Sequence, residues 1–144
     1  MNHAMKRMIL IPVSIALIFA SGCSTPRKAS STVFEGSWTG HDVTPGREGP
    51  ASLLVSGHTL EFHGADANDW LKGTFTLRED ANPKQLAGVI IECPAQDYVG
   101  KNFYAIYKIE GDTLTVAGNE PGNTNIPSAF DDPGTRQIVF QHDQ

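Results

Sequence analysis

The residues of this 144-residue chain with the clearest chemical meaning are its two cysteines. Cys23 follows three small residues, Ala-Ser-Gly at 20–22, and before these lies an apolar run, residues 8–20, preceded by Lys6 and Arg7. A basic start, a short apolar stretch and small residues are the three parts of a secretory signal peptide. An uncut transmembrane anchor is the alternative, but the apolar run is shorter than the about 20 residues that span a bilayer. We therefore expect residues 1–22 to be removed on export.

A cysteine directly after Ser-Gly resembles the cleavage site of bacterial lipoprotein signal peptides. In that family the cysteine thiol receives a diacylglyceryl group, a peptidase cuts before it, and the new amino terminus is acylated. The resemblance implies lipidation of Cys23 and a membrane partner held through the acyl chains (palmitate, for example), because one chain alone binds only marginally. Ser24 stands where an aspartate would favour the inner membrane. The implied location is the cell envelope, at the outer membrane facing the periplasm.

Composition divides the rest of the chain into two parts. Residues 23–32 hold no apolar residue larger than alanine beyond Cys23 itself, so they form a lipidated flexible tether. Residues 33–144 suffice for one compact domain. The net charge is −5 and no basic cluster is present, which argues against a nucleic-acid partner.

The remaining thiol, Cys93, ends the apolar run of residues 87–93. If Cys23 carries lipid through its sulfur, the two cysteines cannot form a disulfide. We therefore expect Cys93 to be a buried structural thiol rather than a reactive one.

Other residue types that support catalysis lack the necessary pattern. Five metal-ligand types lie close in sequence: His41, Asp42, His58, Glu61 and His63. No pair of these histidines has a ligand spacing such as His-x-x-x-His. The chain has no Gly-x-Ser-x-Gly elbow, phosphate loop or dinucleotide motif, and Asp131-Asp132 is typical of a solvated turn. We expect no enzyme activity, no metal and no cofactor.

The domain sequence predicts an all-β fold. Eight short β-rich runs are separated by Gly, Pro, Asn and Asp, at residues 34–42, 51–56, 59–64, 72–79, 85–93, 102–109, 113–118 and 136–142. Tight turns are expected at Ser56-Gly57 and at residues 110–112, the second with a bulge. Eight short sequential strands favour an antiparallel up-and-down eight-stranded barrel, with a sandwich as the competitor.

Two sets of residues carry a family resemblance. Gly36-Ser37-Trp38 is similar to the Gly-x-Trp that opens lipocalins, which implies that Trp38 closes the narrow end of a lipocalin-like barrel. In lipocalins that tryptophan often packs under a basic residue of the last strand, a role that would fall to Arg136.

The second set covers residues 34–140. Its motifs, in order, are Gly73-Thr74-Phe75-Thr76-Leu77, Pro83-Lys84-Gln85-Leu86, residues 107–116, Pro121-Gly122, Pro127, Phe130 and Gly134. They resemble the small uncharacterised lipocalin-like domain family first described in planctomycetes. The chain departs from that family at Ala117, where a cysteine is usual, and at Ile126, where an arginine is usual. The family has no established activity, so the resemblance implies a fold and leaves the function open.

Residues 119–135 form a long connection without strand character, and such loops are often functional. Phe130 within it could be part of a lid that touches a ligand, or could plug one end of the barrel. Trp38, Arg136 and Phe130 are therefore the candidates for ligand binding or barrel closing.

Two hypotheses of function remain. In the first, a membrane-anchored lipoprotein binds a small apolar ligand inside its lipocalin-like barrel in the cell envelope. In the second, the barrel is filled, and a structural or interaction protein contacts an envelope protein partner. Large inward residues favour filling, whereas Gly73, Gly88, Ala105 and Gly118 could leave space. An apolar cavity of about 300 Å³ or more would favour the first hypothesis.

Overall fold

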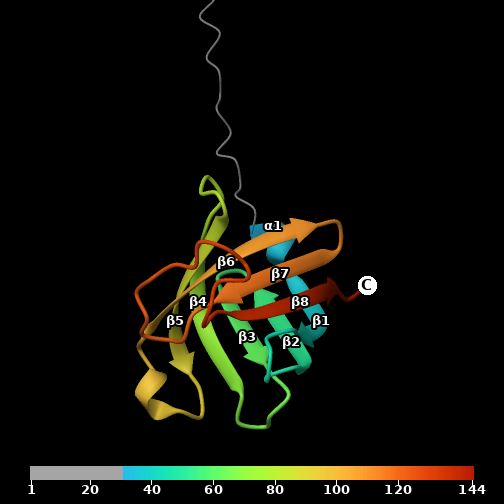
Figure 1. Ribbon diagram of the computed structural model, residues 1–144. Helices are drawn as coiled ribbons and strands as arrows, with labels where there is room; N and C mark the ends of the chain where they lie inside the picture. Colours follow the sequence, from blue (N-terminus) through green and yellow to red (C-terminus); the bar gives the residue numbers. More distant parts are fainter. Residues whose placement is uncertain (1–30) are drawn as a thin grey trace, which may run out of the picture.

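The computed structural model describes residues 31–144 (Figure 1). The predicted signal peptide, the lipidation site Cys23 and most of the predicted tether lie outside these described residues.

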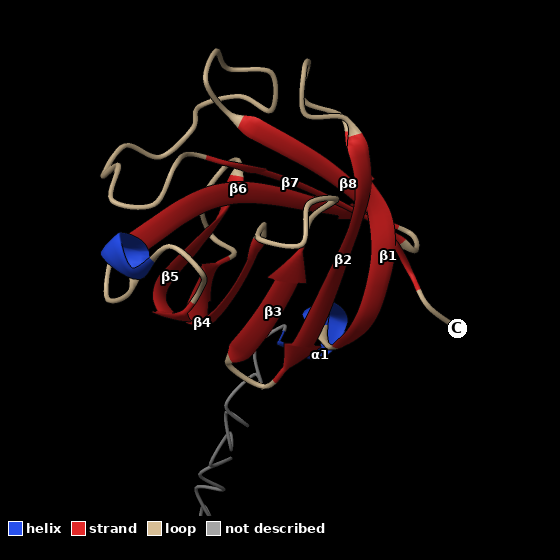
Figure 2. Cartoon of the chain, turned by 90° about the horizontal axis from the view of Figure 1, so that it is seen from below, coloured by secondary structure: helices blue, strands red, loops and turns tan. Residues whose placement is uncertain are grey.

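Eight antiparallel strands form a closed barrel in which each strand pairs with its neighbours in sequence. Their bounds are β1 Gly36–Asp42, β2 Gly49–Ser56, β3 Thr59–His63, β4 Trp70–Arg78, β5 Lys84–Glu92, β6 Asn102–Glu110, β7 Thr113–Gly118 and β8 Arg136–His142. β1 also pairs with β8, from Trp38↔His142 to Asp42↔Ile138, and this pairing closes the sheet (Figures 1 and 2). The up-and-down barrel predicted from the sequence is confirmed, and the sandwich is excluded.

The two tight turns that the sequence predicts each contain a glycine at positive φ. Gly57 and Gly111 have φ of 59° and 61°, a region that side chains other than glycine rarely adopt. The bulge expected at the second turn is absent, because Glu110 pairs directly with Thr113. A register shift lies instead in the pairing of β4 with β5, where Lys72 pairs with Glu92 and Gly73 with Ile90, which leaves Ile91 as the extra residue.

Strand alternation places the large apolar side chains inside the barrel, as the period of two predicts. The inward residues that form the core include Leu60, Phe62, Phe75, Ala105, Tyr107, Leu114, Ile138 and Phe140. Burial of these side chains is the main contribution that stabilises the barrel.

One end of the barrel, the closed end, is capped by a short helix. This helix, α1 (Ser31–Phe34), ends in Phe34, which is 1% exposed and meets Tyr107 edge-on at 5.1 Å between ring centroids. Trp38 donates its Nε1–H to the Phe34 carbonyl at 3.1 Å, which fixes the helix to β1. The helix takes in the last two residues of the predicted tether. Among residues 31–144, no helix is long and apolar enough to span a membrane.

The opposite end, which we call the mouth, is surrounded by four connections. These are residues 43–48, 64–69, 93–101 and 119–135. The third contains a 3-10 turn, η1 (Gln96–Tyr98). These four connections position the candidate site.

Candidate ligand-binding cavity

A cavity of about 1080 Å³ extends from the barrel interior through the mouth to the connections around it. Leu53, Leu60, Leu86, Ile90, Ile138 and Phe140 are among the inward side chains that line it. Phe34 borders it from the closed end, whereas Trp38, Val55, Phe75 and Leu114 belong to the core without lining the cavity. The closed end is therefore filled, and the space lies in the half of the barrel toward the mouth.

The small inward residues account for only part of this space. The ring of Phe103 occupies the room over Gly88, where a Cβ would lie 2.2 Å from Phe103 Cζ, and it also contacts Gly73. Ala105 and Gly118, by contrast, both line the cavity. Of the four small residues expected to leave space, Gly73 and Gly88 make room for the Phe103 ring, and Ala105 and Gly118 border the cavity.

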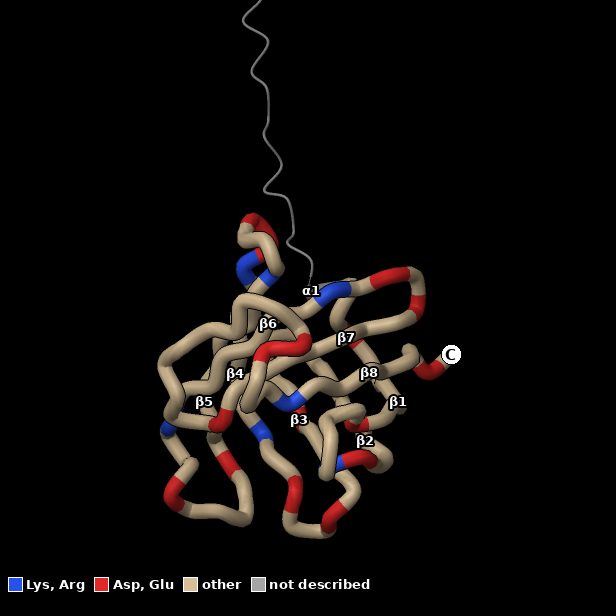
Figure 3. The backbone as a smooth tube through the Cα atoms, in the orientation of Figure 1, with Lys and Arg blue, Asp and Glu red and all other residues tan. Residues whose placement is uncertain are grey.

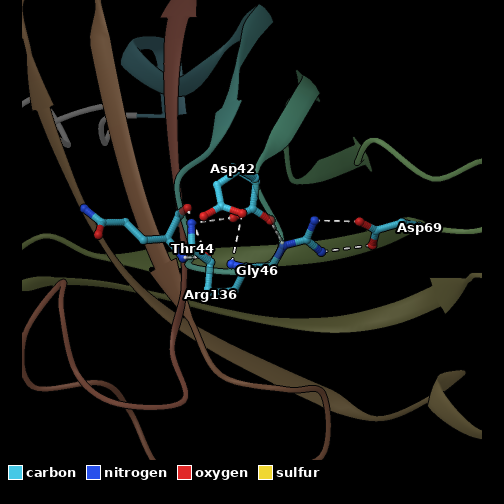
Figure 4. A network of polar contacts seen from close by, with 7 residues as sticks. Asp42, Thr44, Gly46, Asp69 and Arg136 are labelled. Carbon is cyan, nitrogen blue, oxygen red and sulfur yellow. Dashed lines mark hydrogen bonds and ion pairs between the residues drawn. The ribbon is translucent and has the colours of Figure 1, made fainter.

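A charged cluster crosses one side of the mouth (Figure 4). Arg136, the first residue of β8, donates from Nε to Asp42 Oδ2 at 2.6 Å. Its Nη1 and Nη2 donate to the two carboxylate oxygens of Asp69 at 2.9 and 2.5 Å. The guanidinium carbon lies 4.9 Å from the ring centroid of Phe62, so the cation also stacks on the apolar wall.

Local backbone structure positions both carboxylates. Asp42 ends β1 with its side chain 2% exposed, and its Oδ1 accepts the Thr44 N–H at 2.9 Å. The connection to β4 folds on itself so that Gly64 N–H donates to the Asp69 carbonyl at 2.7 Å. A side chain at Gly64 would collide with Asp69, since a Cβ there would lie 2.0 Å from Oδ2.

The contacts in the cluster shift the pKa of Asp42 and the pKa of Arg136 in opposite directions. Burial raises the pKa of Asp42, but hydrogen bonds from Thr44 and Arg136 outweigh this and hold it below its ordinary value. Burial lowers the pKa of Arg136, and the hydrogen bonds to Asp69 and Asp42 outweigh it, so that pKa lies above its usual range. Both residues are therefore charged at neutral pH.

The structure does not bring Trp38 and Arg136 together. Trp38 pairs with His142 across the β1–β8 seam, and the two rings meet edge-on at 4.7 Å. Arg136 lies at the other end of β8, opposite Gly118 of β7. Trp38 packs in the core at the closed end, whereas Arg136 lies at the mouth. The expectation that Trp38 packs under Arg136 is therefore wrong.

Phe130 is half-buried and is not among the core residues. Its ring lies 5.3 Å from Lys108 Nζ, a group on the outer face of β6, and the residue also borders the cavity. Ile106 and Ala117 point outward from β6 and β7 but are 0% exposed, which indicates that the long connection covers this face. Phe130 therefore does not plug the barrel interior.

Hydrogen bonds hold the long connection in place. Asp132 accepts from the Ser128 N–H, the Ser128 hydroxyl and the Ala129 N–H, and these bonds lower its pKa. The Tyr98 hydroxyl bonds to Glu120, which joins the connection to η1 across the rim. The pKa of Tyr98 is raised, chiefly by that bond. As predicted, Asp132 serves a turn.

The remaining sequence candidates are dispersed. His63 bonds to Glu61 at 2.8 Å on the outer face and stacks on Trp70, whereas Asp42 is held by Arg136. Residues 31–144 contain no group of three or more His, Cys, Asp and Glu side chains that could hold a metal ion. Cys93 is buried just beyond β5, with its Sγ donating to the Ala95 carbonyl at 3.0 Å.

The fold and the cavity together define an eight-stranded up-and-down β-barrel with an apolar interior that is open at one end. Such an architecture is compatible with a lipocalin-like fold. The chain matches no protein-family model, no curated protein and no solved structure. Membership of the lipocalin-like family stays a prediction from the sequence motifs.

Proposed function

We propose that this protein binds a small apolar or amphipathic molecule in its barrel, and that acyl chains on Cys23 anchor it in the cell envelope at the outer membrane. The observation that carries the binding role is the apolar cavity of about 1080 Å³, open at the mouth. Ligand sites usually have volumes of about 300 to 1,000 Å³, mostly apolar walls and a few polar groups. Here the walls are Leu, Ile and Phe side chains, and the polar groups gather at the rim.

The alternative role, an interaction protein with a filled barrel, is less well supported. Filling is confined to the closed end, where Phe34, Trp38 and Phe75 pack together. A barrel that served only as a scaffold would gain stability by extending this packing to the mouth. The proposal includes no catalytic step, since Asp42, Asp69 and Asp132 near the mouth all hold structural hydrogen bonds.

A fluorescent probe tests the binding role. The uncharged probe N-phenyl-1-naphthylamine should bind the soluble domain, residues 24–144, with saturation at one site. Ala105→Phe and Val116→Phe each place a ring in the cavity and should weaken binding at least tenfold. Ala87→Phe, on the outer face of β5, is the matched control and should bind like the wild type.

Circular dichroism must show that each variant is folded, and having two cavity variants guards against one that is not. A probe that binds equally well to wild type and to both folded cavity variants would contradict the proposal.

A further inference from the structure

The depth of the cavity differs chemically from its mouth, and this indicates where the bound molecule can carry polar groups; the step rests on the proposed binding function. Most strand residues that line the cavity are apolar. Trp70 and Arg136 line it too, but each is the first residue of its strand, at the mouth. Tyr104 and Gln137 alternate with inward residues and so face outward. The strand wall below the mouth, in the part of the chain that the structure describes, therefore offers no polar side chain.

The backbone of this wall is likewise engaged. Every strand of the closed barrel has a partner on both sides, so its N–H and C=O groups serve the sheet. Within residues 31–144, the buried side-chain atoms that lack a hydrogen-bond partner are Gln85 Oε1 and Tyr107 Oη. Neither residue lines the cavity. A ligand group that reaches the described wall at depth therefore meets no hydrogen-bond partner.

Polar groups gather instead at the mouth. Figure 3 shows the charged residues mainly in the turns and connections at the two ends of the barrel. Asp42, Arg136 and Asp69 bond to one another at the mouth, and the cavity continues past them to the surrounding connections. A polar ligand group there keeps its contact with water, whereas one at depth loses water and gains no partner. Burying a hydroxyl in that way weakens binding about tenfold to hundredfold.

We infer that the cavity selects molecules whose polar groups all lie at one end, and that it holds them with the apolar end toward Phe34 and the polar end at the mouth. Long-chain alcohols and phenols with an unsubstituted far end belong to this class. Molecules with a polar group at each end are rejected, because one of these groups must lie against the apolar wall. The selection concerns the position of the polar groups and not their number.

A pair of rigid isomers tests this inference. 3,5-Dihydroxybiphenyl carries both hydroxyls at one end, whereas 4,4′-dihydroxybiphenyl carries one at each end and cannot fold back on itself. The two compounds contain the same atoms and are uncharged at neutral pH. Calorimetric titration of the purified protein should show that the one-ended isomer binds at least about tenfold more tightly than the two-ended isomer.

A hydroxyl introduced into the wall should relax the rejection. Val116→Thr nearly keeps the side-chain volume and adds a hydroxyl at a position that lines the cavity. It should tighten binding of the two-ended isomer several fold, because the buried hydroxyl then has a partner, and should leave the one-ended isomer nearly unchanged. Val89→Thr, the same change at an exposed position on the outer face of β5, is the matched control and should alter neither.

The outcomes separate the two proposals. If N-phenyl-1-naphthylamine binds but the one-ended isomer binds no more tightly than the two-ended one, the cavity is a binding site and the one-ended selection is wrong. A ratio of the two affinities that is unchanged in folded Val116→Thr would contradict the selection as well. If neither the probe nor either isomer binds, the binding function itself fails and the inference fails with it.

Discussion

At the scale of single residues, the least predictable feature is the cluster of Asp42, Arg136 and Asp69. The sequence suggests that Arg136 belongs to the last strand, but its partners are 94 and 67 residues away. Nothing in the local pattern connects them, because the contact exists only once β8 has paired with β1. The position of Trp38 at the closed end, in contrast, was implied by the resemblance of Gly36-Ser37-Trp38 to the Gly-x-Trp of lipocalins.

Replacing Arg136 should destabilise the fold strongly. Arg136→Met leaves Asp42 buried without its cation, and breaking a buried pair in this way costs about 3 to 5 kcal/mol. Urea denaturation should show this loss of stability. Arg78→Met is the control, because Arg78 is an exposed residue at the end of β4, and it should cost less than about 0.5 kcal/mol. Equal effects of the two substitutions would show that the cluster does not stabilise the barrel.

Asp42 should also make the free energy of unfolding depend on pH. Its pKa is lowered in the folded state from the ordinary value of 3.8, so the ionised form favours the fold. The stabilisation is present above about pH 4 and is lost as the pH falls through the folded-state pKa. The stability difference between wild type and Asp42→Asn should therefore narrow below pH 4 in denaturation series. A difference that stays constant down to pH 2 would contradict this account.

Trp38 should stabilise the fold more through the packing of its buried side chain than through its hydrogen bond. Trp38→Ala removes a side chain that is 2% exposed and should cost about 3 to 5 kcal/mol. Trp38→Phe keeps most of the packing but loses the bond to the Phe34 carbonyl, which is worth about 1 kcal/mol. Thermal melts of the two variants should separate these contributions; a Trp38→Ala melt like that of the wild type would remove the packing role.

At the scale of elements, the strands were predictable and the caps were not. Alternation from Ala51 to Val55 fixes both the strand and its inward face, because a strand half-buried in a barrel must alternate. The helix α1 has only four residues, too few for a helical period. It forms because Phe34 is buried over the core, a tertiary effect that local sequence does not carry.

The cavity was only partly foreseeable for a related reason. Composition showed glycines and alanines on inward positions, but it could not show that Phe103 turns into the space over Gly88. Which small residues leave room depends on side-chain packing between β4, β5 and β6. The sequence also did not predict that the long connection covers β6 and β7. Alternation places Ile106 and Ala117 on the outer face, where exposed side chains are expected, yet both are 0% exposed.

Gly88 and Gly118 offer a matched pair to test that packing. In Gly88→Ala the new Cβ would lie 2.2 Å from Phe103 Cζ and 2.5 Å from the Thr74 carbonyl oxygen, so the sheet must shift, at a cost of about 1 to 3 kcal/mol. In Gly118→Ala the nearest atom is 3.4 Å away, and the effect should stay below about 1 kcal/mol. Chemical denaturation of both proteins should rank them in this order, and the reverse order would refute the packing described here.

At the scale of the whole molecule, the chain enters the barrel at the end opposite the mouth. The described residues begin with α1, which caps the closed end (Figure 2). Residues 24–30 can span at most about 3.6 Å each. An anchor at Cys23 would therefore keep the closed end within about 25 Å of the membrane, whereas the mouth could lie farther away.

Two measurements check this anchoring. Cys23→Ala should shift the protein from the membrane fraction to the soluble fraction, because no acyl chain can be attached. In the lipidated protein, a fluorophore at Asp80→Cys, near the closed end, should be quenched by nitroxide lipids more than one at Asn68→Cys, at the mouth. Equal quenching, or membrane retention of Cys23→Ala, would contradict the proposed attachment.

The most direct test of the account is the native mass of the protein purified from its own cells without detergent. The central claim is that the barrel binds a small molecule in the half toward the mouth. Wild-type protein should therefore show, beyond the mass of the chain and any covalently attached lipid, a discrete noncovalent addition that disappears on gentle activation. The addition should be absent from folded Ala105→Phe and retained in Ala87→Phe. A bare wild-type mass, or an addition that persists unchanged in Ala105→Phe, would contradict the claim.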